Sequence, residues 1–301
     1  MIIIIPHTID YAAVTSSVPE ADTPAWAADT TYAKGATARV NYELFTSLVD
    51  NNKGNNPPAS TAGLTAPWRK SGTSNRGAMF DPFVYTQTVA AGDSLEISVP
   101  WNMAAGFAVF NISGAVAMSV AIADAAGAVV AAKDYNLLQG VDNWYDYYTA
   151  RFSFIRDIVD MTIGGFLVGT CTVTLRGDRP AIGHIVVGEV EDPGVTMDGV
   201  TSELVHYSTI ETDDLGVTAI VERAATKKIS CTLTMPKVRS DAVFELFEKL
   251  RARPCVWMGD NVPVDAGGQQ FLTAFGLWRK ATLSDRGTSL CKYDLEIMGL
   301  I

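Results

Sequence analysis

The stretch WAADTTYAKGATARVNYELF, residues 26–45, decides the fold of the N-terminal part of the chain, because it sets large aromatic side chains around a glycine turn. One extended segment leads to Gly35, and a second returns through Val40 to Phe45. Farther along, Trp68 closes the unit. A domain of this size buries little surface, so it depends on aromatic rings that each remove roughly 150 to 250 Å² from water. We therefore predict a small β-module over residues 24–72.

The order of aromatic and glycine residues in this module resembles the small chitin-binding-type carbohydrate modules. Its polar insert, residues 47–57, is similar to the form of the module carried by tail proteins of tailed bacteriophages. In sugar-binding members some rings form an exposed platform for a pyranose. The resemblance implies four candidate sugar-contact residues here, namely Trp26, Tyr32, Tyr42 and Trp68.

Two departures from the sugar binders favour a structural role for these rings. The middle of the module, often aromatic in sugar binders, reads DNNKGNN over residues 50–56, and Gly35-Ala36 replaces the usual Gly-Asp turn. The resemblance also extends past the module, because SNRGAMFD at residues 74–81 is similar to the phrase that follows it in phage tail proteins. Gly77 stands there in place of the usual aromatic residue. We predict a module whose rings mainly form a core, with sugar recognition as the alternative.

Composition indicates an ordered, mainly β protein. Of 301 residues, 48% are hydrophobic and 19% are charged, which is typical of a globular chain. The formal net charge of −10 and the scattered basic residues argue against a nucleic-acid groove. The N-terminal MIIII is too short and too soon broken for a signal peptide or a membrane span, and is predicted to be a strand. Residues 1–23 form an arm that either completes the C-terminal sheet or clamps a neighbour.

Neither the cysteines nor the histidines predict a metal site or a cofactor. Four cysteines lie far apart in apolar contexts and are expected to be reduced core residues. Three histidines are widely separated in sequence, and no nucleophile elbow, zinc helix or phosphate loop occurs. Paired carboxylates occur only as sequence neighbours, whereas a glycosidase needs two that face each other. We predict no catalytic residue, no metal and no cofactor, and therefore no enzyme.

Residues 81–178 are predicted to form a β-sandwich of the jelly-roll or galectin-like kind. Alternating segments such as SLEISVP and TVTLRG are separated by glycines without a helix pattern between them. The aromatic cluster NWYDYYTARFSF, residues 143–154, admits two interpretations. Trp144 and Tyr145 are candidate sugar contacts at the edge of such a sandwich. The favoured interpretation is a long strand whose alternate residues enter the core and whose tyrosines line a contact between subunits.

Residues 181–301 are predicted to form a β-domain with one packed helix. Ser240 is the expected N-cap, and Pro254 ends the helical pattern. Four apolar residues are predicted to form one packing stripe on this helix, namely Val243, Phe244, Phe247 and Leu250. The phrase IGHIVVGEVEDPGVTMDGV and this element order resemble the tail-tube or belt domain of phage tube, distal-tail and hub proteins.

The resemblance implies a structural virion protein at the tail tip or baseplate of a long-tailed phage. Its partners would be further copies in a hexameric or trimeric ring, the tail tube protein, hub and baseplate proteins, tail fibres and a host surface glycan. It would be made in the host cytoplasm, would not enter a membrane, and would meet nucleic acid only as a lining of the tail lumen. The alternative is a carbohydrate-binding adhesin that contacts the host surface.

Overall fold

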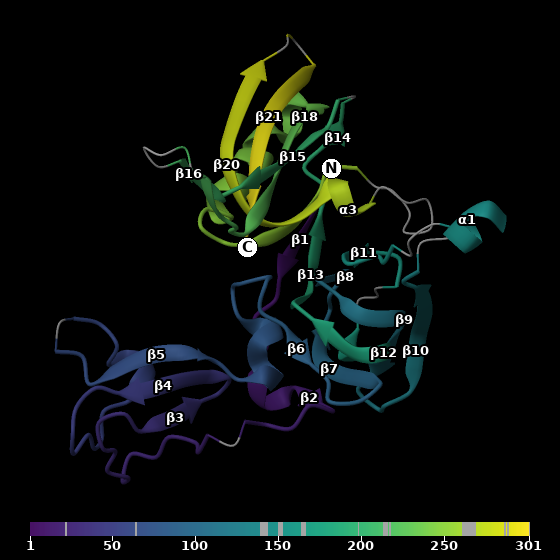
Figure 1. Cartoon of the computed structure of the whole chain (residues 1–301). Helices are drawn as coiled ribbons and strands as arrows, with labels where there is room; N and C mark the ends of the chain where they lie inside the picture. The colour runs from purple at the N-terminus through teal and green to yellow at the C-terminus, as the bar shows by residue number, and fades with distance from the viewer. Residues whose placement is uncertain are drawn as a thin grey trace.

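The computed structural model is mainly β, as predicted, and it is built from antiparallel sheets (Figure 1). It describes residues 1–21, 23–63, 65–138, 144–149, 153–163, 167–197, 199–212, 216, 218–260, 269–285, 287 and 289–300. Helices are short in this part of the chain, and none of those described is long and apolar enough to cross a membrane. The helices are α1 (Trp144–Thr149), α2 (Ser240–Lys249) and α3 (Gln269–Leu272), with 3-10 turns η1 (Tyr11–Ala13), η2 (Pro57–Ala59), η3 (Asn75–Phe80) and η4 (Lys237–Arg239).

The largest sheet has ten strands drawn from the whole length of the chain. Its N-terminal strand β1 lies in the middle, paired antiparallel with β13 on one side and β19 on the other. The MIIII segment therefore forms a central strand, and the arm completes this sheet. In spatial order the strands are β11 (Ile158–Asp160), β8 (Gly106–Phe110), β13 (His184–Glu191), β1 (Ile2–Pro6), β19 (Cys255–Met258), β20 (Thr273–Asp285), β21 (Leu290–Gly299) and β18 (Ala225–Pro236), with β14 (Val195–Thr196) and β15 (Thr201–His206) both on the far edge of β18.

This sheet is curled. Phe110 on β8 and Phe275 on β20 are separated by three intervening strands, yet their ring centroids lie 5.9 Å apart. The concave face therefore closes over its own cluster of buried side chains, which includes Ile4, Val186 and Val256. At one end of the sheet, the opposite face supports the sandwich core, and at the other end it supports α2.

A second, six-stranded sheet packs on the β11–β8–β13 end of the large sheet, and together they form a sandwich. Leu95, Val120 and Val173 from the small sheet share one core with Phe107 and Ile185 from the large one. The predicted boundary between residues 178 and 181 falls inside a single strand, because β12 runs through it. The strands are β10 (Val129–Asn136), β9 (Ser113–Asp124), β12 (Val168–Ile182), β7 (Ser94–Asn102) and β2 (Thr15–Ser16), with β6 (Thr88–Val89) also paired to β12.

The aromatic module is a separate three-stranded sheet to one side of the sandwich (Figure 1). Its core consists of Tyr32, Ala38, Phe45 and Trp68, and Trp26 packs against them. The strands are β3 (Thr37–Val40), β4 (Glu43–Ser47) and β5 (Trp68–Thr73). A fourth sheet is the hairpin formed by β16 (Thr209–Thr212) and β17 (Thr218–Val221).

Gly77 explains how the module joins the rest of the chain. A β-carbon at this position would lie 2.0 Å from the β-carbon of Tyr42, so a side chain does not fit. The close approach lets the Tyr42 ring pack on Tyr11 and Phe80, with centroid distances of 5.4 and 6.4 Å. The absence of a side chain at Gly77 thus permits this packing at the junction.

Candidate functional site

Two of the candidate sugar-contact rings of the module are buried. Tyr32 is 7% exposed and Trp68 is 1% exposed, and their rings meet edge to face with centroids 5.1 Å apart. Their polar atoms are used internally, because the Tyr32 hydroxyl accepts from the backbone N–H of Ala27 and the Trp68 indole donates to the carbonyl of Asn55. Neither ring is available to stack on a sugar.

The other two candidates of the module are half-buried. Trp26 packs against the module core, and its indole nitrogen is buried without a hydrogen-bond partner in the described part of the chain. Tyr42 belongs to the junction with Tyr11 and Phe80, where burial raises its pKa. The four rings therefore do not form one exposed platform. Tyr32 and Trp68 belong to the module core, Trp26 packs against that core, and Tyr42 packs at the junction.

The aromatic cluster that follows residue 143 differs from the favoured prediction. Residues 144–149 form the short helix α1 instead of a strand. Trp144, Tyr145 and Tyr148 are 78, 76 and 76% exposed, so they do not fill the sandwich core. Trp144 and Tyr148 are one helical turn apart, and their rings stack with centroids 6.2 Å apart and planes inclined by 21°. Phe152, in the same cluster, lies outside the described residues.

Helix α2 packs on the large sheet through three of its four predicted apolar residues. Val243, Phe247 and Leu250 are buried, and the Phe247 ring is parallel to that of Trp257 with centroids 6.3 Å apart. Phe244 is 55% exposed, because it is about 100° around the helix from Val243. Ser240 is the first residue of the helix and not its N-cap, since the 3-10 turn η4 runs directly into α2.

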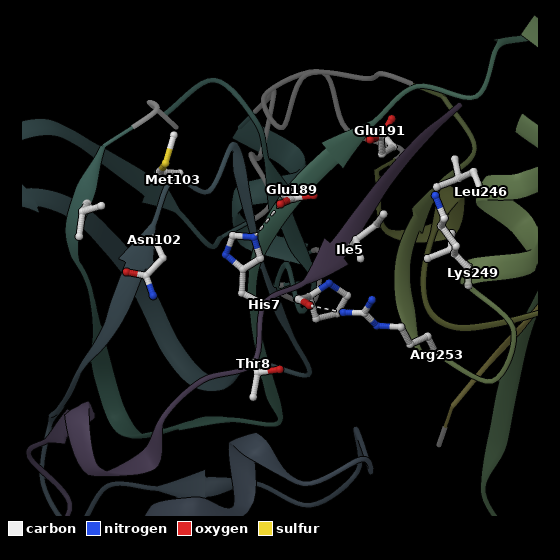
Figure 2. Close-up of a pocket in the computed structure, with 13 residues that line it drawn as sticks. Ile5, His7, Thr8, Asn102, Met103, Glu189, Glu191, Leu246, Lys249 and Arg253 are labelled. Carbon is white, nitrogen blue, oxygen red and sulfur yellow. Dashed lines mark hydrogen bonds and ion pairs between the residues drawn. The ribbon is translucent and has the colours of Figure 1, made fainter. Parts of the chain in front are cut away.

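A groove of about 800 Å³ lies where the sandwich and the helix-covered part of the large sheet meet (Figure 2). Ile5 on β1 and Glu189 on β13 line its middle (Figure 2). Met103 from the sandwich lies on one side, and Lys249 at the end of α2 and Arg253 in the segment after it lie on the other (Figure 2).

The carboxylates of this groove lie on one strand and do not face each other across it. Glu189 and Glu191 are two residues apart on β13, so both point to the same face of that strand. The facing wall presents Lys249 and Arg253 instead of a second carboxylate. His7 Nε2 lies 3.6 Å from Glu189 Oε1, and the Arg253 guanidinium donates to the carbonyl of Pro6. The first contact links the end of β1 to the neighbouring strand β13, and the second links β1 to the segment that follows α2. The described residues that line the groove include no facing carboxylate pair of the kind a glycosidase uses.

The cysteines are free and buried, as expected. Burial raises the pKa of Cys171 and Cys255 to about 12 and that of Cys231 to about 11, so these thiols stay protonated and unreactive at neutral pH. In the described part of the chain, no three His, Cys, Asp or Glu side chains gather in a way that could hold a metal ion.

Two exposed features were missed by the sequence analysis. The β16–β17 hairpin presents Ile210 and Ile220, which are 67 and 70% exposed. A polar groove also forms around Arg156, from segments far apart in sequence. The β-branched residues of the TIET and TAIV segments could have indicated a hairpin from the sequence. No local pattern could have indicated the groove, because its lining residues come from separate segments.

In comparisons with known proteins, no family model, no curated protein and no solved structure matches the chain.

Proposed function

We propose that this chain is a structural protein of a bacteriophage tail tip or baseplate, in which identical copies form a ring. The proposal starts from the sequence resemblance to phage tail proteins in the module, in residues 74–81 and in the C-terminal region. On this proposal the large sheet and α2 form the ring, and the ring contacts the tail tube and hub proteins. The sandwich and the aromatic module project from it.

The observation that carries the proposal is the exposed β16–β17 hairpin. Ile210 and Ile220 lie directly opposite one another in its register and are 67 and 70% exposed. An isolated two-stranded hairpin is marginally stable in water, and a clustered apolar surface usually marks an interface. The adjacent edge strand β15 adds Leu204, which is 71% exposed. A second copy of the chain that covers this edge would bury these side chains together.

Light scattering on the full-length protein, across a dilution series, tests the proposal. We expect a multi-chain assembly for the wild type, and a monomer for the double variant Ile210→Lys/Ile220→Lys. Val129→Lys/Val130→Lys is the matched control, because these two valines are 63 and 58% exposed on strand β10 of the sandwich, outside the proposed ring. A wild-type monomer at every concentration would contradict self-assembly into a ring. An assembly that the double variant leaves intact would remove the hairpin from the interface.

The exposed rings of α1 favour a second candidate function, that of an adhesin for carbohydrate at the host surface. Stacked, exposed aromatic rings such as Trp144 and Tyr148 offer a flat apolar face to a sugar ring. Adsorption of the purified protein to host cells should fall for Trp144→Ala and Tyr148→Ala. The control is Tyr85→Ala, since Tyr85 is also an exposed aromatic residue, at 61%. Equal adsorption of all these proteins would refute a contact through α1.

A further inference from the structure

A second groove, of about 830 Å³, opens where the turn between β8 and β9 meets the segment that follows α1. Its lining combines amide and hydroxyl side chains with one phenyl ring and one guanidinium. The volume is within the range of about 300 to 1,000 Å³ that is usual for small-ligand sites. The residues that matter for its chemistry are Gln87, Asn111, Ser113, Phe154, Arg156 and Gln270.

Internal hydrogen bonds hold the walls of this groove in place. The Gln87 amide donates to the carbonyl of Asn111 at 2.7 Å and to the hydroxyl of Ser113 at 3.1 Å. The Asn111 amide donates to the carbonyl of Val84, and its backbone N–H donates to Asp157. These bonds fix the turn before any ligand arrives, and such preorganisation reduces the entropy lost on binding.

Arg156 is the only charged side chain among the groove's described lining residues. Its backbone N–H donates to the side-chain oxygen of Gln270 at 2.9 Å, and its carbonyl accepts from the N–H of Ile112 at 2.8 Å. The guanidinium itself is exposed, and it makes no hydrogen bond or ion pair with the described part of the chain. A fixed backbone thus presents a free, planar cation that suits a carboxylate or a phosphate.

Aromatic side chains extend this polar surface. Phe154 lines the groove and is 44% exposed. The last residue of α1, Thr149, is four residues before Ser153 on the groove wall, so their α-carbons are at most about 14 Å apart. Chain length therefore keeps the end of α1 near the groove wall.

We propose that this groove binds a saccharide that carries an anionic group, a carboxylate or a phosphate ester. Arg156 receives the anion as a bidentate partner, the amides of Asn111 and Gln270 meet the hydroxyls, and Phe154 covers an apolar face of a sugar ring. This inference rests on the second candidate function, contact with carbohydrate, and is independent of ring assembly.

Binding of defined oligosaccharides to the full-length protein, measured by calorimetry, tests the inference. The probes are tetragalacturonate with its neutral methyl ester, pentamannose 6-phosphate with its dephosphorylated form, and inorganic phosphate alone. The variants are Arg156→Ala and the control Arg69→Ala, which removes another exposed arginine from strand β5 of the module. Arg156→Ala keeps the structural hydrogen bonds at this position, because the backbone makes them.

We expect at least one anionic oligosaccharide to bind tenfold or more tightly than its neutral counterpart, and Arg156→Ala to lose about tenfold or more of that affinity, as removal of a charge-assisted hydrogen bond implies. Arg69→Ala should bind as the wild type does. A difference in affinity between tetragalacturonate and its methyl ester would identify a carboxylate as the anion, and a difference between pentamannose 6-phosphate and its dephosphorylated form would identify a phosphate.

Three results would overturn the inference. In the first, no oligosaccharide binds at concentrations up to about 1 mM. In the second, an oligosaccharide binds and Arg156→Ala leaves its affinity unchanged. In the third, inorganic phosphate binds as tightly as the sugars do. Two comparisons separate this inference from the proposed functions. Adsorption that depends on Trp144 but not on Arg156 would keep the adhesin function and reject the groove. Light scattering on the same samples measures the number of chains in the assembly, and so tests ring formation independently of sugar binding.

Discussion

His184 gives the fold a calculable dependence on pH. The side chain is 8% exposed on β13, and its ring lies 4.3 Å, centroid to centroid, from that of Phe275. Burial lowers the pKa of His184 from 6.5 to about 4, although a hydrogen bond to the backbone of Asp81 acts in the opposite direction. Its Nδ1 is buried and has no hydrogen-bond partner in the described part of the chain, so the site favours the neutral ring.

The sign of the effect follows from the two protonation states. Between pH 6.5 and about pH 4 the histidine of the unfolded chain binds a proton and the folded one does not. The stabilisation that the neutral His184 contributes is therefore fully present above pH 6.5 and is lost as the pH falls toward 4. The interval of about 2.5 pH units, at about 1.4 kcal/mol each, gives a loss of about 3.5 kcal/mol.

Urea denaturation at pH values from 7.5 to 4, followed by tryptophan fluorescence, measures this loss. The comparison variant is His184→Gln, because glutamine does not titrate and its amide can still donate to the carbonyl of Asp81. We expect the wild-type free energy of unfolding to fall more steeply than that of the variant, with the difference developing below pH 6.5. Parallel curves for the two proteins would refute the buried neutral state of His184.

Three further substitutions, two of them paired with a control substitution, test the packing and one buried hydrogen-bond network. Phe247→Ala should lower the free energy of unfolding by about 3 to 5 kcal/mol, because its ring fills the core under α2; Phe244→Ala, at a position 55% exposed, should change it by about 0.5 kcal/mol or less in the same urea titration. Asp160→Asn should cost about 2 kcal/mol at pH 7, because the carboxylate is 3% exposed and accepts bonds from a lysine, a tyrosine and a threonine; an unchanged denaturation midpoint would contradict this network. Gly77→Ala should cost about 1 to 3 kcal/mol through overpacking against a neighbouring tyrosine side chain, and Gly92→Ala, where nothing lies within 4 Å, is its control in thermal denaturation.

The sequence predicted those parts of the fold that depend on local pattern. The alternating segments SLEISVP and KKISCTLTM lie in strands β7 and β18, and the apolar periodicity after residue 239 gives α2. Phe244 was wrongly included in the packing stripe, because adjacent helical residues point about 100° apart.

Pairings between distant segments could not be predicted. Strand β1 is placed between β13 and β19, which are more than 180 residues away, and no local pattern selects such partners. The same holds for the groove at Arg156, whose walls come from four separate segments. Residues 144–149 were predicted as part of a long strand whose alternate residues enter the core, but they form a helix in which Trp144 stacks on Tyr148 one turn later.

Ring formation is the central claim, and the mass of the full-length protein in solution tests it most directly. Light scattering across a dilution series should give a closed assembly of several chains that persists on dilution, and Ile210→Lys/Ile220→Lys should reduce it to a single chain. A wild-type protein with the mass of one chain at every concentration would contradict the account.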